Sequence, residues 1–392
     1  MLTFVPLTGF LGAGKTTTMV AAAKAMQERG HKVAVITNDQ STALIDSQLA
    51  RSDLDAAAEV TGGCFCCRFD DLVGTVMALV TESGVDTVIA EAVGSCTDLQ
   101  ATVVRPLRQY YGDWVTVTPL TTILDPMRHL AFERAAQRGE PESDLSYLFH
   151  RQLAEADVIA LNKLDLIPAD RAREALDQLS ARYPDAVVVG YSAAAGDGLD
   201  TLVETWSNPA SNSEVNLEVD YDRYAAAEAQ LAWLNQELRL QAASGSFDPG
   251  QWARVVLEYL SSWAQETGAV IGHAKVTAGD EDYAKLSVVE AGAEPRLDRA
   301  GAGTASQAQA LINARIGCEP EDLDRAVTLA VAAADAACGV MSSATPAASF
   351  KPGYPRPTHR LAASAVPPGG VTALAAWLGL AAIPCLVPGP GL

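Results

Sequence analysis

The chain is poor in positive charge. Its 392 residues include 28 lysines and arginines against 48 aspartates and glutamates, which gives a formal net charge of −20. Proteins that bind nucleic acids need a basic surface to contact phosphates. The shortage of basic residues therefore argues against nucleic acid as the main partner, although it says little about the fold.

Cysteine and histidine are also scarce. The seven cysteines are an odd number with uneven spacing, so the chain does not resemble a disulfide-bonded scaffold. The five histidines are far from one another, so a histidine-rich tract that could store metal is missing. They are His31, His129, His150, His273 and His359.

Long uninterrupted apolar runs are missing as well. The opening residues MLTFVPLTGF carry no basic region before an apolar stretch, so we expect no secretory signal and a cytoplasmic, reducing compartment. Residues 371–388 are uncharged, but a spanning helix needs roughly 20 apolar residues, and this run is short and contains Pro384. We expect a poorly ordered tail and no membrane partner, with a tail anchor as the alternative.

The first 206 residues alternate apolar runs with helical patterns, which predicts an α/β domain with a mostly parallel sheet. Buried parallel strands have continuous runs of Val, Ile and Leu, as at 157–163 and 186–192. The other expected strands are 2–7, 32–38, 86–92 and 116–125. The expected helices are 15–29, 70–83, 98–111, 145–155, 170–182 and 198–206.

Residues 207–220 are polar and predict a linker. Residues 221–341 then show the order β-α-β-β-α, with another strand to close it, which predicts a small ferredoxin-like α/β domain. Its strand patterns are at 224–241, 271–279, 283–291 and 309–317, and its helix patterns at 248–268 and 319–339. Residues 342–392 are rich in Pro, Gly and Ser and predict an irregular tail.

Residues 9–16, GFLGAGKT, fit the pattern G-x-x-x-x-G-K-[ST] of a phosphate-binding loop (P-loop) between a strand and a helix. Its glycines let backbone N–H groups approach phosphate oxygens. Lys15 reaches the β- and γ-phosphates, and the Thr16 hydroxyl is placed for Mg²⁺. The residues expected to contact the nucleotide are Gly9, Gly12, Ala13, Gly14, Lys15, Thr16 and Thr17.

A guanine-recognition pattern follows the strand expected at 157–163. Asn162, Lys163 and Asp165 match N-K-x-D, in which the aspartate accepts hydrogen bonds from guanine N1–H and the exocyclic amine. Adenine lacks this paired donor edge, so a buried unmatched carboxylate would disfavour ATP. Ser192 and Ala193 follow the next strand, where GTPases place a backbone N–H against guanine O6. Together these motifs favour GTP.

Two acidic residues lie where expected strands end. Asp39 follows the strand at 32–38, and Glu91 lies near the end of the strand at 86–92. Either carboxylate is placed to hold Mg²⁺ directly or through water, and so to support catalysis with Lys15. A helix cap or a turn is the structural alternative for Asp39. No arginine finger is evident within the chain, so we expect slow intrinsic hydrolysis.

The segment at 61–72, TGGCFCCRFDDL, places three of the seven cysteines in four positions. Thiolates are soft ligands that suit Zn²⁺ or another thiophilic ion. Three ligands, Cys64, Cys66 and Cys67, leave one coordination position open, so a bound ion can be exchanged. A buried cluster of small apolar side chains is the structural alternative.

The residues around this motif add to the expectation. Gly62 and Gly63 permit a tight bend, and Arg68 could lower the thiol pKa values. Cys96 could approach as a fourth ligand, with a buried structural thiol as the favoured alternative. The motif lies between the second and third strands, where GTPases place nucleotide-sensing switches. We therefore expect metal affinity to depend on the bound nucleotide.

The combination of TGFLGAGKTT, GGCFCC, NKLD and EAVG resembles the CobW-like P-loop GTPases, relatives of the nickel-insertion GTPases that serve urease and hydrogenase. The resemblance covers residues 1 to about 206; beyond them only the element order is similar. It implies a GTP- and Mg²⁺-dependent metallochaperone with Zn²⁺ or Co²⁺ at Cys64, Cys66 and Cys67. It implies delivery to a client metalloprotein or a cofactor-assembly protein. A homodimer is a further option.

Three features depart from that family. NDQSTALID stands where Asn-Glu/Asp-Phe-Gly is common, Ala92 replaces the usual Ser or Thr after Glu91, and no histidine-rich stretch is present. Three other interpretations stay open: a GTPase that assists cobalt handling in corrinoid assembly, a thiol redox sensor that gates a regulatory GTPase, and a purely structural zinc site.

Overall fold

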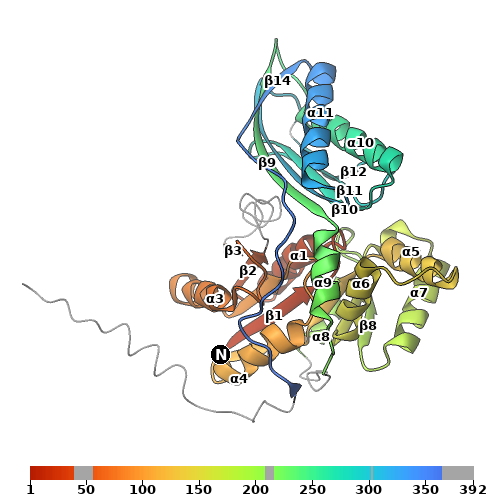
Figure 1. Ribbon diagram of the computed structural model, residues 1–392. Helices are drawn as coiled ribbons and strands as arrows, with labels where there is room; N and C mark the ends of the chain where they lie inside the picture. The colour runs from red at the N-terminus through yellow and green to blue at the C-terminus, as the bar shows by residue number, and fades with distance from the viewer. Residues whose placement is uncertain (39–55, 208–215, 302, 364–392) are drawn as a thin grey trace, which may run out of the picture.

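The computed structural model of the protein describes residues 1–38, 56–207, 216–301 and 303–363. Figure 1 shows two units, one above the other, and each is built on its own sheet. The first sheet has the order β3-β2-β4-β1-β6-β7-β8, with β5 beside the start of β1, and its strand pairs are parallel. Its strands are β1 (Leu2–Thr8), β2 (Val33–Asn38), β3 (Ala57–Val60), β4 (Thr87–Glu91), β5 (Val115–Val117), β6 (Thr121–Leu124), β7 (Val158–Leu161) and β8 (Val187–Gly190).

Helices cover both faces of this sheet, as the alternating sequence pattern predicts. Apolar side chains of α1 and α8 share one core cluster with the strands, and those of α3, α4 and α6 share the other. The helices of this unit are α1 (Lys15–Glu28), α3 (Phe69–Ser83), α4 (Arg105–Tyr111), α5 (Pro126–Gln137), α6 (Asp144–Ala154), α7 (Ala169–Arg182) and α8 (Leu199–Thr205).

Four details of this unit differ from the expectation. The strand expected at 116–125 is two strands, β5 and β6, interrupted around Pro119, whose missing N–H cannot join a ladder. The helix expected at 98–111 starts with a π-helical turn at Gln100–Val104 before α4. The short strand β3 and the helix α5 were not expected at all.

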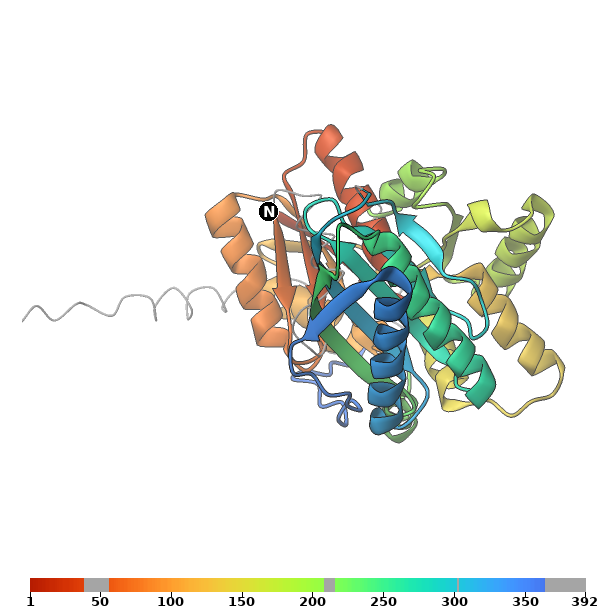
Figure 2. The same ribbon diagram turned by 90° about the horizontal axis from the view of Figure 1, so that it is seen from above.

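The second unit has the sheet order β12-β11-β10-β13-β9-β14, with antiparallel pairs. The order β14-β9-β13-β10 is that of a ferredoxin-like domain, which confirms the predicted fold, and β11 and β12 extend it. In Figure 2, α10 and α11 run side by side across one face of this sheet. The elements are β9 (Ala232–Ala242), α10 (Pro249–Thr267), β10 (Ile271–Gly279), β11 (Ala284–Val288), β12 (Arg296–Arg299), β13 (Gln307–Ile316), α11 (Pro320–Cys338) and β14 (Val340–Ala344).

The strand expected at 224–241 begins later than its pattern indicated. Residues Tyr221–Ala229 form the helix α9, and its N-terminus is capped by the Asp220 carboxylate. Only the alternating second half of the segment forms β9. The domain boundaries proposed at 206 and 221 stay a prediction.

The chain returns from the second unit to the first after β14. Residues 345–363 descend along the first unit, and Phe350 pairs with Trp233 on the way (Figure 1). The irregular tail expected from 342 is thus corrected at its start, where residues up to Ala344 form β14. The tail-anchor candidate at 371–388 lies outside the described residues. Among the residues that are described, no helix is long and apolar enough to cross a membrane.

Candidate functional site: a P-loop beside a cysteine motif

The P-loop joins β1 to α1 at the carboxyl edge of the first sheet. Gly9 and Gly14 have φ angles of 136° and 96°, which side chains rarely adopt. A Cβ on Gly9 would lie 2.1 Å from the carbonyl oxygen of Ile123, so only glycine fits there. Lys15 Nζ donates to Gly9 O at 2.7 Å and so folds back over the loop. The first N–H groups of α1 thus border a space suited to an anion.

Thr16 and Glu91 meet at the base of the P-loop. The Thr16 hydroxyl is 3.0 Å from both carboxylate oxygens of Glu91, and both side chains are buried. A hydroxyl and a carboxylate are hard oxygen donors, so this pair fits Mg²⁺. Asp39, the third residue expected at Mg²⁺, lies outside the described residues.

The base-recognition residues lie beside the P-loop. Asn162 Nδ2 donates to Ala13 O at 3.0 Å, and Asn162 Oδ1 accepts from Ala193 N–H at 3.0 Å. The Ser192 hydroxyl donates to Asp165 Oδ1 at 2.6 Å and so orients that carboxylate. A backbone N–H of Ser192 or Ala193 was expected at guanine O6; the N–H of Ala193 is donated to Asn162 here, and the contact with O6 stays a prediction.

An ion pair holds these two loops together. Lys163 Nζ lies 2.7 Å from Gly12 O and 2.6 Å from Asp125 Oδ2. Asp125 follows β6 and caps α5 by accepting from the N–H groups of Met127 and Arg128. Burial raises the pKa of Asp125, but Lys163 and the cap N–H groups lower it, and the net shift is downward. Asp125 therefore stays ionised and keeps Lys163 over the P-loop.

The three cysteines of the motif lie together, as the spacing predicts. The sulfur separations are 2.6 Å for Cys64–Cys66, 3.4 Å for Cys64–Cys67 and 3.7 Å for Cys66–Cys67. Zinc–sulfur bonds of about 2.3 Å in a tetrahedral site place sulfurs roughly 3.8 Å apart. Only the Cys64–Cys66 pair has to open substantially, by roughly 1 Å, so the donor set fits a zinc ion. Among the described residues, these three are the group whose ligand atoms all lie within 4.8 Å of one another. Cys96 is buried beside them and hydrogen-bonded to Cys64 and Cys66, so its role as a fourth ligand stays a prediction.

Two of the three thiols have raised pKa values. Hydrogen bonds with Cys64, Cys67 and Cys96, together with burial, raise the pKa of Cys66. The pKa of Cys67 is raised to about 11, chiefly by its hydrogen bond with Cys64. Arg68 forms an ion pair with Asp71, and the pKa values of Cys66 and Cys67 are raised rather than lowered as expected. A metal ion therefore has to displace protons when it binds.

One side chain touches both sites. Asn38, at the end of β2, donates from Nδ2 to Val60 O and to Gly63 O, both at 2.9 Å. Its Oδ1 accepts from the N–H of Phe65 at 3.0 Å, within the cysteine motif. The same residue lines the cavity that contains the P-loop. A displacement of Asn38 would therefore move the backbone on both sides of Cys64.

Residues 354–361, which we call the C-terminal strap, lie across the cysteine motif. The N–H of Arg356 donates to Cys67 Sγ at 3.2 Å, and the N–H of Thr358 donates to Cys66 O at 2.8 Å. Cys64 and Cys66 are buried, whereas Cys67 is half-buried. The strap thus contacts the most accessible of the three cysteines.

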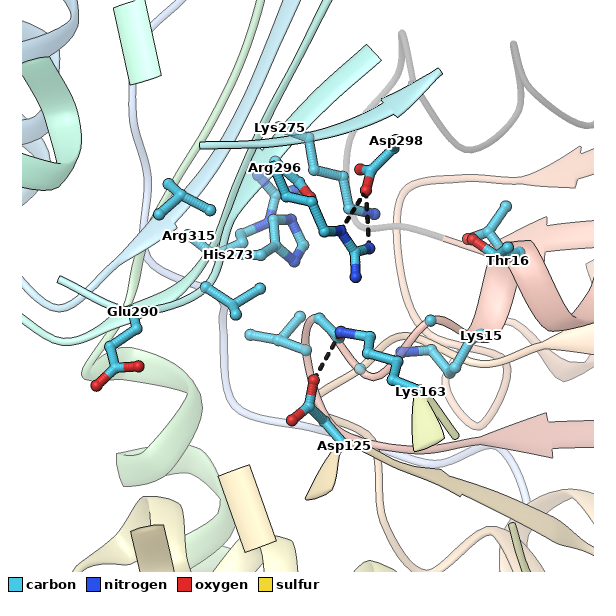
Figure 3. Close-up of a pocket in the computed structure, with 18 of the residues that line it drawn as sticks. Lys15, Thr16, Asp125, Lys163, His273, Lys275, Glu290, Arg296, Asp298 and Arg315 are labelled. Carbon is cyan, nitrogen blue, oxygen red and sulfur yellow. Dashed lines mark hydrogen bonds and ion pairs between the residues drawn. The ribbon is translucent and has the colours of Figure 1, made fainter. Parts of the chain in front are cut away.

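The second unit faces the P-loop across a cavity of about 220 Å³ (Figure 3). The first unit contributes both phosphate-loop and base-loop residues to its walls, Lys15, Thr16, Glu91, Asp125 and Lys163. The second sheet contributes a set of basic residues, His273, Lys275, Lys285, Arg296 and Arg315. The nucleotide-binding space is therefore shared between the two units.

Comparison with known proteins agrees with this geometry. Residues 3–189 match the model of the CobW/HypB/UreG nucleotide-binding domain. The CobW-type domain contains the P-loop, the cysteine motif and Asn162, Lys163 and Asp165, while Ser192 and Ala193 lie just beyond the matched range.

Curated relatives have informative names. The zinc chaperone CobW of Pseudomonas aeruginosa is 28% identical over 55% of this chain and 61% of its own length. The zinc chaperone CobW of Sinorhizobium sp. is 31% identical over 45% of this chain and 54% of its own length. The zinc-regulated GTPase metalloprotein activator 1 of Dictyostelium discoideum is 29% identical over 43% of this chain and 41% of its own length. The matches thus span about half of the relatives' length.

Sequence reasoning missed several residues of this site. Asp125 could have been found, because an acidic residue before Pro126 at the end of an apolar run is an N-cap pattern. Asn38 ends an expected strand beside Asp39, but nothing in its spacing shows that it contacts the cysteine motif. The basic residues of the second sheet alternate with apolar ones, which signals a polar face but not what it faces.

Proposed function

We propose that this protein is a GTP-dependent zinc chaperone of the cytoplasm. In this proposal it binds and hydrolyses GTP, carries zinc at Cys64, Cys66 and Cys67, and delivers it to a client metalloprotein. Zinc is its cargo rather than a resident cofactor. The observation that carries the proposal is that Asn38 lines the nucleotide cavity and holds the cysteine motif. The names of the curated relatives support zinc over cobalt as the cargo.

In this proposal different side chains bind the phosphates, the base and the metal ion of the nucleotide. The P-loop and Lys15 bind the phosphates, and Asp165, oriented by Ser192, accepts hydrogen bonds from guanine. Thr16 and Glu91 would hold Mg²⁺, which neutralises charge on the β- and γ-phosphates when bound. Glu91 ends β4, so the sheet fixes its carboxylate against the P-loop.

Coupling between the two sites would pass through Asn38. A γ-phosphate and its metal ion displace neighbouring loops in GTPases. Movement of Asn38 would release Val60, Gly63 and Phe65 and so change the separations of the cysteine sulfurs. By linkage, nucleotide must change zinc affinity by the same factor that zinc changes nucleotide affinity.

The test is a zinc titration of the reduced protein against a chromophoric chelator, with either a non-hydrolysable GTP analogue or GDP bound. We expect one zinc per chain, loss of binding in Cys66→Ala, and different affinities in the two nucleotide states. Cys338→Ala is the matched control, because Cys338 is a free cysteine in α11 of the second unit.

Each other outcome identifies a different function. Zinc binding that ignores the nucleotide would indicate a structural or storage site. Tighter binding of cobalt than of zinc would favour cobalt handling for corrinoid assembly. Absence of metal binding would favour thiol redox chemistry, which the 2.6 Å contact of Cys64 with Cys66 allows.

A further inference from the structure

The face of the second sheet that meets the nucleotide cavity is rich in cations. In β10, Ala274 and Val276 belong to the apolar core shared with α10 and α11, whereas Lys275 lines the cavity. Lys285 in β11 and Arg296 in β12 line it too. These cations occur in a chain whose net charge is −20, so their convergence is not a consequence of composition.

Two of these cations lie opposite the P-loop. In Figure 3 the side chains of Lys275 and Arg296 extend from the second sheet into the cavity, and Lys15 and Thr16 of the first unit lie to the right of them. Glu290, an acidic residue of the same wall, points away from them. Cationic side chains that face the P-loop across one space raise the positive potential there and so favour a bound anion such as phosphate.

We propose that Lys275 and Arg296 bind the γ-phosphate of GTP from the second unit, opposite Lys15. This inference rests on the proposed GTP site and extends it to a second unit that the family match at residues 3–189 does not include. The inference also identifies cations within the chain that take the place of an arginine finger, which was not evident from the sequence. During hydrolysis, the oxygen of water bonds to the γ-phosphorus, and the bond between that phosphorus and the β–γ bridging oxygen breaks. The bonding electron pair leaves with GDP, and the water gives up a proton to the phosphate and the solvent. These two cations stabilise the charge on the departing phosphate and the GDP.

Contacts between the units hold the two cations in position. The Arg128 guanidinium in α5 donates to the carbonyl oxygens of Ile271, Gly272 and Val289 at 3.0, 3.1 and 3.0 Å. The same guanidinium lies 5.5 Å from the ring centroid of Phe10, in the P-loop. The start of β10 and the end of β11 are thus fastened beside the P-loop. Lys275 extends from β10, and Arg296 extends from β12, which pairs with β11.

Asp298 prepares Arg296 for a phosphate. It accepts from Arg296 Nε at 2.8 Å and from Nη2 at 2.7 Å. A guanidinium has five N–H donors, so this pairing fixes its plane and leaves donors for a second anion. The Asp298 carboxylate also weakens the positive potential that a phosphate meets. Removing its charge should therefore strengthen phosphate binding.

The experiment compares the affinities of a fluorescent GTP analogue and of fluorescent GDP, with Mg²⁺, in the full chain. We expect Lys275→Gln and Arg296→Gln each to weaken the GTP analogue roughly ten- to hundredfold, the usual effect of losing a charged hydrogen bond, and GDP less than about twofold. The hydrolysis rate at saturating GTP should fall at least as far. Asp298→Asn should tighten the GTP analogue.

Arg325→Gln is the matched control. Arg325 belongs to the same unit, but it lies on α11, which covers the other face of the sheet, and its side chain is 70% exposed. It should leave both affinities unchanged. An unchanged ratio of GTP to GDP affinity in both Lys275→Gln and Arg296→Gln would overturn this inference alone. Absence of GTP binding by the unmodified protein would instead overturn the proposed function.

Discussion

Replacing Arg360 by glutamine should release the C-terminal strap from the cysteine motif. Arg360 Nε donates to Asp98 Oδ2 at 2.6 Å, and Nη2 donates to Leu217 O at 3.1 Å. The Asp98 side chain is only 2% exposed, and it also accepts from the Tyr221 hydroxyl at 2.8 Å. Arg360 is thus the charged anchor that follows Arg356 and Thr358, the strap residues on the cysteines.

The size of the effect follows from the exposure of the two partners. A hydrogen bond between charged groups contributes about 1.5–3 kcal/mol when it is well shielded. The Arg360 side chain is 49% exposed, so water screens its end of the pair, and we expect about 1–2 kcal/mol. If zinc leaves only while the strap is detached, its release should become roughly five- to thirtyfold faster.

The assay mixes zinc-loaded protein with an excess of chromophoric chelator and follows the rate of zinc transfer. Lys351→Gln is the matched control, because Lys351 forms an ion pair with Glu319 in the same returning segment but precedes the strap. Equal transfer rates for Arg360→Gln and the unmodified protein would refute the reasoning. Circular dichroism should show that both variants keep their fold.

Three further outcomes are expected. Glu91→Gln removes the carboxylate that pairs with Thr16, so phosphate release from GTP should slow at least about tenfold, and an unchanged rate would exclude the Mg²⁺ assignment. Asp165→Asn should weaken GTP roughly ten- to hundredfold and favour xanthosine triphosphate, measured by competition; retained GTP preference would exclude Asp165 as the guanine acceptor. Burial, with the charge of Asp98, raises the pKa of Glu155 from 4.5 to about 8. The stabilisation from the folded-state proton is complete below about pH 4.5 and is lost as the pH rises through 8. Urea unfolding at pH 6 and 8.5 should therefore show a larger loss of stability in the unmodified protein than in Glu155→Gln.

The strands of the first unit were predictable because parallel strands are buried on both faces. The run of β7 is wholly apolar, and that of β4 is apolar between Thr87 and Glu91, which is typical of strands buried on both faces. The same reasoning failed at 116–125, because hydropathy does not show that a proline at 119 interrupts the ladder. It also failed at α9, whose alanines fit a helix as well as a strand.

The site residues were predictable where a single local motif specifies a single function. The P-loop and the cysteine motif are local, so their spacing alone places Lys15, Thr16 and the sulfurs. Contacts that join distant segments carry no such local pattern. Asn38 on the cysteine motif and Lys275 opposite the P-loop depend on how whole elements pack, and the strap depends on the return of a proline-rich segment that lacks periodicity.

Because the strap lies near the end of the described chain, the cysteine motif is synthesised well before the strap that covers it. The cysteine motif and the whole first sheet are complete once α8 has been made, at Thr205, whereas Arg356 follows about 150 residues later. At a synthesis rate of about 5–20 residues per second, the ribosome needs roughly 8–30 s to add them. During that interval the sulfur of Cys67 lacks its contact with Arg356. A nascent chain therefore exposes the Cys67 sulfur more than the finished protein does.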